Sequence, residues 1–147
     1  MKSQIDQFLA CKKFAIAGVS RDKNKFGNAI FREMKKKDYN ILPVNPNMEE
    51  FEGEKCYKSV SDLPADVEAL IVITKPDVSH SIVKEALKKG IRNIFIQQGA
   101  YNAKIDELSL KNEANIICKQ CILMFANPTG IHKFHERLAK FFRFYPN

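Results

Sequence analysis

An apolar run that ends in a glycine, followed by a helix-forming pattern, constrains the fold of this chain more than any other feature. Residues 14–17 are apolar, Gly18 follows, and after a short loop Gly27 opens a segment with helical periodicity. A glycine after a strand lets the backbone approach a ligand closely, and the first helical turn carries N–H groups without intrahelical partners. Strand, glycine turn and helix start together predict an anion-binding loop, with phosphate as the expected group.

The loop between the two glycines is polar and basic. Arg21 and Lys25 would neutralise a bound phosphate, and Val19, Ser20 and Phe26 complete the segment. The pattern is not GxGxxG, because only two glycines are present, so it does not specify a nucleotide. An ordinary strand-to-helix turn with solvated lysines is the alternative interpretation.

Strand and helix patterns alternate along the rest of the chain, with short connections. After a short N-terminal helix, strands are expected at residues 13–19, 40–44, 68–74, 91–97 and 115–118, and helices at 25–37, 75–89, 102–112 and 130–144. Residues 48–60 are expected to be an irregular connection. The segment 68–74 has a continuous apolar centre, which indicates burial on both faces, as in a parallel sheet.

Helical crossovers between successive strands predict the fold class. The expected fold is α/β: a single Rossmann-like, doubly wound domain over residues 1–147. Its sheet would be five-stranded and mostly parallel, with helices on both faces.

Polar or conformationally special residues follow four of the expected strands. They are Ser20, Asn45-Pro46, Thr74-Lys75-Pro76 and Gln98-Gly99. In a doubly wound sheet the ligand lies outside the carboxyl ends of the strands, near the point where the strand order reverses. We therefore expect one binding site built from these four loops.

The end of the second strand argues against an ordinary NAD site. Dinucleotide-binding domains place an acidic residue there to hold the ribose hydroxyls, whereas this chain has Asn45 followed by proline. The strand-end loops are instead basic, at Arg21, Lys25 and Lys75. This favours a nucleotide with an additional phosphate on its ribose, either coenzyme A or NADP, and spacing does not separate the two.

A set of short motifs is spread along the chain in a defined order. They are Ala17-Gly-Val-Ser20, Lys25-Phe-Gly27, Val44-Asn-Pro-Asn47, Gly53-Glu-Lys-Cys-Tyr57, Asp62-Leu-Pro64, Ile73-Thr-Lys-Pro76, Gln97-Gln-Gly-Ala100 and Cys121-Ile-Leu-Met124. They cover about residues 12–125. In this order they resemble the small stand-alone CoA-binding domain proteins, a family similar to the CoA-binding domain of the succinyl-CoA synthetase alpha subunit.

The resemblance implies a Rossmann-like fold that binds coenzyme A. It implies that the Gly18-Val19-Ser20 loop binds the phosphates of CoA, and we expect Gly27 to help shape this loop. It places the adenosine among Asn45, Pro46 and the Thr74-Lys75-Pro76 loop, and we expect Gln98 and Gly99 to close the far wall.

Two departures from the family pattern carry consequences. Asp38 stands where the family has a glycine before Tyr39, so an aspartate must make the left-handed helix cap. The segment after about residue 127, rich in phenylalanine, does not follow the pattern.

No catalytic constellation is evident in the sequence: neither a Ser/His/Asp set, nor a paired-carboxylate pattern, nor a P-loop lysine. The resemblance implies that the ligase needs a second domain with a phosphorylated histidine, which 147 residues are too few to hold. We therefore expect binding of CoA or acyl-CoA without catalysis. An NADP- or NAD-binding oxidoreductase-like or redox-sensing domain is the enzyme-class alternative. The third hypothesis is that the protein binds RNA through its net charge of +7. The sequence shows no clustered basic face with interleaved aromatic residues to support it.

Cys118 and Cys121 form a CxxC pair, and His132 and His135 follow, which invites a zinc hypothesis. The spacing between the pairs is poor, and residues three apart in a strand face opposite ways. We expect no metal, and a packing role or a place near the pantetheine thiol for Cys121.

The expected last helix, 130–144, has a phenylalanine-rich stripe and a basic remainder. Such a helix most simply covers the open face of the sheet, and its phenylalanines leave room for a homodimer contact or a partner enzyme.

The longest apolar runs, 69–73 and 122–126, are too short to span a bilayer, and residues 1–13 lack a signal-peptide pattern. A cytoplasmic location is expected, without membrane or nucleic-acid partners.

Overall fold

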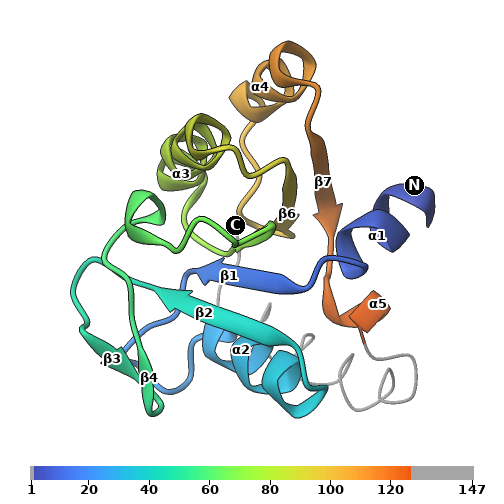
Figure 1. The fold of residues 1–147 in the computed structure, drawn as a ribbon. Helices are drawn as coiled ribbons and strands as arrows, with labels where there is room; N and C mark the ends of the chain where they lie inside the picture. The colour runs from blue at the N-terminus through green and yellow to red at the C-terminus, as the bar shows by residue number, and fades with distance from the viewer. Residues whose placement is uncertain (1, 127–147) are drawn as a thin grey trace.

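The computed structural model describes residues 2–126 (Figure 1). Its elements are, in chain order, α1 (Lys2–Leu9), β1 (Lys13–Ala17), α2 (Phe26–Lys36), β2 (Asn40–Val44), β3 (Glu50–Phe51), β4 (Glu54–Lys55), the 3₁₀ turn η1 (Val60–Asp62), β5 (Ala69–Val72), α3 (Pro76–Lys89), β6 (Asn93–Gln97), α4 (Lys104–Asn112), β7 (Asn115–Gln120) and α5 (Leu123–Ala126). The helix expected at 130–144 lies outside the described residues.

The main sheet has five strands in the order β2-β1-β5-β6-β7, and all neighbouring strands are parallel. From β1 the chain moves outward to β2, and it then returns past β1 to form β5 on the other side. The direction of winding therefore reverses between β1 and β5, which is where doubly wound folds bind ligands. The predicted five-stranded parallel sheet is confirmed.

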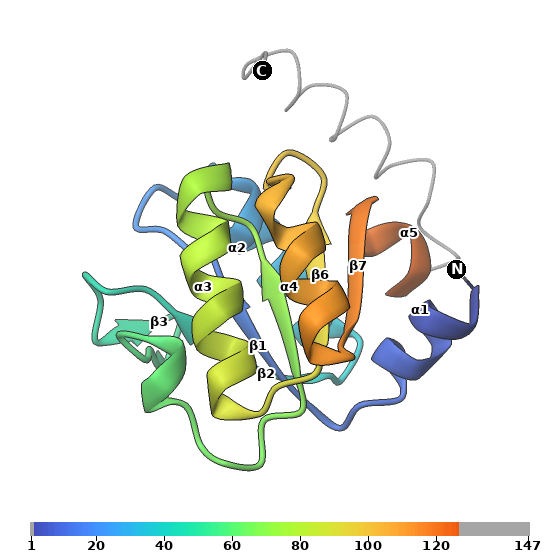
Figure 2. The ribbon, with the colours of Figure 1, turned by 90° about the horizontal axis from the view of Figure 1, so that it is seen from above.

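Helices cover both faces of this sheet, as predicted. Helices α3 and α4 lie on one face and α2 on the other, with α1 and α5 near β7 (Figures 1 and 2). Each face has its own apolar core, because β-strand side chains alternate between the two faces. Phe14 and Ile16 of β1 belong to the core on the α2 side, and Ala15 and Ala17 belong to the core on the α3 side.

Residues 48–60 are more regular than expected. They contain the antiparallel hairpin β3-β4, whose turn places Glu52 at φ 46° and Gly53 at φ 82°. Phe51 packs edge-on against Phe31 of α2, with ring centroids 5.1 Å apart. Arg32 and Lys35 of α2 form ion pairs with Glu52 and Glu54, so the hairpin is held against this helix.

The apolar pattern of α3 predicts a buried stripe of Val78, Ile82, Val83, Ala86 and Leu87, and this prediction is wrong at Val78. Val78 is 48% exposed, whereas Ser79 is completely buried together with Val83, Ala86 and Leu87. Residues 79, 83 and 86 share one face of a helix with a period of 3.6 residues, and residue 78 is turned away from it. Ser79 tolerates burial because its hydroxyl contacts Thr74 and the Lys75 carbonyl.

The expected aspartate cap at the end of α2 is confirmed. Asp38 has φ 63°, in the left-handed region, and its N–H donates to the Lys35 carbonyl at 3.0 Å. Aspartate tolerates this region better than most residues other than glycine.

Among residues 2–126, no helix has both the length and the apolar character needed to cross a bilayer.

Candidate functional site

The two glycines of the first loop are in direct contact with each other and with the end of β5. A Cβ at Gly18 would lie 2.3 Å from the Ile73 carbonyl oxygen, and a Cβ at Gly27 would lie 2.2 Å from the Gly18 carbonyl oxygen. Gly18 also has φ 133°. Both positions therefore exclude any side chain, and the start of α2 is brought onto the end of β1 at the reversal point of the sheet.

Asn28 gives the loop its shape, and sequence reasoning missed this residue. Its side chain is buried; Oδ1 accepts the Ser20 N–H at 2.8 Å, and Nδ2 donates to the Ser20 carbonyl at 2.8 Å and the Asp22 carbonyl at 3.0 Å. A buried amide that satisfies three main-chain groups stabilises a single loop conformation. The sequence feature that could have identified Asn28 is its place in the first helical turn after the loop.

This arrangement changes which main-chain donors are available to an anion. The Ser20 N–H is occupied by Asn28, and the Ser20 hydroxyl accepts the Asp22 N–H at 3.1 Å. Across residues 2–126, no acceptor pairs with the N–H groups of Arg21 or Gly27. Gly27 lies in the first turn of the 11-residue helix α2, where the helix dipole favours negative charge.

Val19 and Phe26 differ from the polar members of the loop. Both side chains are buried in the core on the α2 side, at 2% and 8% exposure. They anchor the two ends of the loop, while the side chain of Arg21 is exposed and that of Lys25 is half-buried.

Asn45 joins the first loop to the segment beyond β2. Its Nδ2 donates to the Val19 carbonyl at 2.7 Å, and its Oδ1 accepts the Asn47 N–H at 2.7 Å. Its main-chain N–H donates to the Tyr57 carbonyl at 2.9 Å. The Asn45 side chain therefore orders the loops, and Pro46 beside it is exposed.

The loop after β5 lies next to the first loop. The Ile73 N–H donates to the Ala17 carbonyl at 2.8 Å, which extends the pairing of β1 with β5. The Thr74 hydroxyl lies 2.7 Å from the hydroxyl of the buried Ser79, a second residue that sequence reasoning missed. Lys75 and Pro76 are exposed at the start of α3.

Gln98 and Gly99 lie at the same edge of the sheet, after β6. Both are exposed, Gly99 has φ 93°, and the Gln98 N–H donates to the Gln120 carbonyl at 3.0 Å. The preceding Gln97 is buried, and its Oε1 accepts the Ile122 N–H at 3.2 Å. The loop after β1 thus contacts both the loop after β2 and the loop after β5, and the loop after β6 follows next along the edge.

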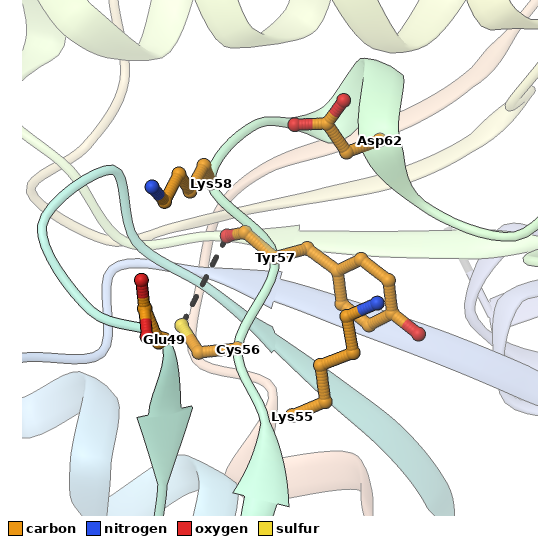
Figure 3. Close-up of a pocket in the computed structure, with 6 residues that line it drawn as sticks. All are labelled: Glu49, Lys55, Cys56, Tyr57, Lys58 and Asp62. Carbon is orange, nitrogen blue, oxygen red and sulfur yellow. Dashed lines mark hydrogen bonds between the residues drawn. The ribbon is translucent and has the colours of Figure 1, made fainter.

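A pocket of about 540 Å³ lies beside this loop cluster, on the outer side of β2 (Figure 3). It is lined by Glu49, Lys55, Cys56, Tyr57, Lys58 and Asp62. Tyr57 is bridged to Val44, the last residue of β2, so the pocket adjoins the carboxyl end of that strand. The motif at residues 53–57 was the sequence signal, but the expected site did not include its residues.

The two cysteines of the CxxC motif belong to opposite faces of the sheet. Cys118 packs against the core on the α3 side, and Cys121 lies in the core on the α2 side. Burial, with a further contribution from the Asp106 carboxylate, raises the pKa of the Cys118 thiol to about 11. Residues 2–126 contain no group of three His, Cys, Asp or Glu side chains arranged to hold a metal ion, and His132 and His135 lie outside this range.

Comparisons with known proteins agree with this architecture. Residues 12–127 match a family model described as CoA binding domain. The chain is 30% identical over 138 residues to an ADP-forming acetate–CoA ligase of Methanocaldococcus jannaschii, covering 92% of this chain and 20% of the ligase. It spans between 14% and 20% of the length of the acetate–CoA ligases that it matches.

Solved structures of similar small proteins share the fold. A conserved hypothetical protein from Pyrococcus furiosus superposes with a TM-score of 0.74 at 35% identity, over 77% of this chain and 97% of that one. A hypothetical protein from Pyrococcus horikoshii OT3 gives a TM-score of 0.77 at 28% identity, over 94% and 91% of the two chains.

Proposed function

The chain belongs to the family of CoA-binding domains, and from this premise we propose that it binds CoA or acyl-CoA at the carboxyl edge of its sheet. The pyrophosphate would lie on the loop between Gly18 and Gly27, and the adenosine would lie toward β2. The pantetheine arm would run along the edge toward Gln98 and Gly99.

The contact between Gly18 and Gly27 carries this proposal. It removes side chains from the one place where the strand order reverses, so that a phosphate can approach the backbone and the first turn of α2. The N–H groups of Arg21 and Gly27 would donate to the pyrophosphate. The side chains of Arg21, Lys25 and Lys75 would neutralise its charge.

We assign no catalytic step to the chain itself. The matched segments span only between 14% and 20% of the acetate–CoA ligases that it resembles. The remaining parts of such an activity would come from a partner enzyme, or from segments beyond this sequence. The proposed contribution of this domain is therefore to hold and present the CoA, in the cytoplasm.

The experiment is thermal unfolding of the purified protein with CoA, dephospho-CoA, NADP and NAD. A ligand that binds only the folded state raises the unfolding midpoint by mass action. We expect CoA to raise it most. A larger shift with NADP or NAD would instead support the oxidoreductase-like alternative, and no shift with any of them would contradict nucleotide binding at this edge.

Charge reversal then tests the location of the site. Lys25→Glu combined with Lys75→Glu should abolish the CoA-dependent shift without unfolding the domain. The matched control is Lys37→Glu with Lys111→Glu, which reverses two exposed lysines at the ends of α2 and α4. Equal CoA shifts in the two double variants would exclude the proposed phosphate position.

A further inference from the structure

Strand β7 is the last strand of the main sheet and pairs with a neighbour, β6, on one side only (Figure 1). In a parallel ladder, alternate residues direct their main-chain groups to the same neighbour. The Asn115 N–H donates to the Arg92 carbonyl just before β6, so the main-chain groups of Ile116 and Cys118 face away from the sheet. Across residues 2–126 these outward groups have no hydrogen-bond partner. We call them the β7 edge.

The opposite edge of the sheet, at β2, is protected in two ways. Strand β2 contains Pro43, which has no N–H to donate to another strand. The Tyr57 N–H donates to the Pro43 carbonyl, and Tyr57 is bridged to Val44, so part of that edge is already occupied. Strand β7 has no proline, and its pairing is irregular only near Lys119, which has φ 62°. An open, regular edge is a template for pairing with another chain.

An exposed leucine lies beside the β7 edge. Leu110 of α4 is 84% exposed. One turn earlier on this helix, Asp106 accepts a hydrogen bond from the Tyr101 hydroxyl at 2.5 Å, and the Lys119 ammonium of β7 lies 4.6 Å from the centroid of the Tyr101 ring. The Asp106 side of α4 therefore faces β7. Because residues four apart share one side of a helix, and α4 ends where β7 begins, Leu110 lies on that side toward Ile116 (Figure 2).

The edge is self-complementary in an antiparallel arrangement. With a two-fold axis at Ile116, the outward groups of Ile116 in two copies face each other, and Ala114 of each copy faces Cys118 of the other. Such opposed residues exchange two N–H···O bonds in an antiparallel pair. The side chains of these residues lie on the α3 side of the sheet and are half-buried. The axis thus brings two Ile116 and two Leu110 side chains together on one face of the joined sheets.

The charges at the two ends of the edge favour the antiparallel orientation. Glu113 precedes β7 and Lys119 lies near its end; both are exposed, and neither forms an ion pair within residues 2–126. Antiparallel pairing about Ile116 brings Glu113 of each copy near Lys119 of the other, whereas parallel pairing would bring like charges together. Asp106 lies beside Lys119 and offsets part of its charge, so these pairs select the orientation and contribute little to affinity.

We propose that the protein forms a two-fold symmetric homodimer through the β7 edge and Leu110 of α4, with the two main sheets joined into one. An interface of this kind uses the same patch on both copies, as in most soluble oligomers. The proposal does not depend on CoA binding. Strand β6 separates β7 from the reversal point between β1 and β5, so the dimer leaves the proposed phosphate loop open.

Sedimentation equilibrium of the full chain tests the dimer, and we expect a mass near twice 16.8 kDa. Leu110→Glu would place two carboxylates near each other at the axis. Since like charges across an interface are costly, the dimer dissociation constant should rise about tenfold or more. Val78→Glu is the matched control, because it also replaces an exposed apolar side chain, on α3. It should leave the constant within about twofold of the wild type.

A disulfide cross-link tests the register. Opposed residues of a hydrogen-bonded antiparallel pair have Cα atoms about 5.5 Å apart, which a disulfide can bridge. In a Cys118→Ser background, Ile116→Cys should therefore give a covalent dimer on mild oxidation, detected by non-reducing gel electrophoresis. The control is Leu42→Cys in the same background, a half-buried position on the opposite edge strand, and it should not cross-link.

Three outcomes would overturn the inference. A wild type with the mass of a single chain at all concentrations up to about 1 mM would exclude a dimer of useful affinity. A dimer that is unaffected by Leu110→Glu and not cross-linked by Ile116→Cys would use another surface. Equal weakening by Leu110→Glu and Val78→Glu would show a general effect of added charge. Far-UV circular dichroism of each variant confirms folding.

Discussion

Gly27 lies against the carbonyl oxygen of Gly18, so closely that a Cβ at Gly27 would come within 2.2 Å of it. The contact joins the first turn of α2 to the residue that follows β1, and Gly18 in turn lies against the Ile73 carbonyl after β5. Three elements thus meet at the reversal point of the sheet without an intervening side chain. The shape of the proposed phosphate site depends on this packing.

Gly27→Ala should destabilise the protein and weaken CoA binding. The added methyl group meets main-chain atoms rather than a flexible side chain, so we expect a loss of about 1–3 kcal/mol in the free energy of unfolding. Urea denaturation measures the stability, and titration with CoA measures the binding. Gly90→Ala is the control, because Gly90 has φ 99° but open space around it. It should cost stability through backbone strain and leave CoA affinity unchanged; an equal effect of both variants on affinity would contradict the prediction.

Asn28→Ala should loosen the loop. It removes three hydrogen bonds to the Ser20 and Asp22 main chain, and the loss should be about 1–3 kcal/mol of stability. Because the loop also loses its single conformation, CoA affinity should fall. The control is Asn24→Ala in the same loop, whose side chain is exposed. Should Asn24→Ala weaken CoA binding as much as Asn28→Ala, the ordering role of Asn28 would be refuted.

Ser79→Ala should remove the support of the Thr74 hydroxyl. Ser79 is completely buried, and its hydroxyl lies 2.7 Å from that of Thr74 and 3.1 Å from the Lys75 carbonyl. We expect a loss of about 1 kcal/mol in the free energy of unfolding. Ser81→Ala, an exposed serine on the same helix, should change stability by less than about 0.5 kcal/mol. Urea denaturation measures both variants. Equal losses in the free energy of unfolding would show that the Ser79 hydroxyl does not support the fold.

The Cys118 thiol should make stability fall at alkaline pH. Burial raises its pKa from the ordinary value of 9.0 to about 11, so the folded state holds the thiol proton more tightly than the unfolded state. The resulting stabilisation is fully present below pH 9.0 and is lost as the pH rises through about 11. The free energy of unfolding of the wild type should therefore fall more steeply over this interval than that of Cys118→Ala. Parallel curves for the two proteins would show that this thiol does not contribute.

The alternation of strand and helix could be predicted because it depends on short-range patterns. The predicted strand at 40–44 agrees with β2 (Asn40–Val44), and the helix predicted at 75–89 agrees to within one residue with α3 (Pro76–Lys89). Proline at a helix start and a glycine after its end are local signals, and Gly90 indeed ends α3 in the left-handed conformation. The family motifs likewise led to the CoA-binding domain family, which the match over residues 12–127 confirms.

The two glycines of the first loop and the parallel sheet could be predicted from the sequence, as could the edge of the sheet at which we propose the site. Which groups meet at that edge depends on how the chain packs. Asn28 and Ser20 are eight residues apart, and Tyr57 reaches Val44 across the β3-β4 hairpin. A periodic apolar stripe specifies which face of an element is buried. The partner of each buried polar group depends instead on strand order and register, which are set by packing between distant segments. For that reason the pocket beyond β2, with Lys55 and Lys58 at its rim, emerged only from the folded chain.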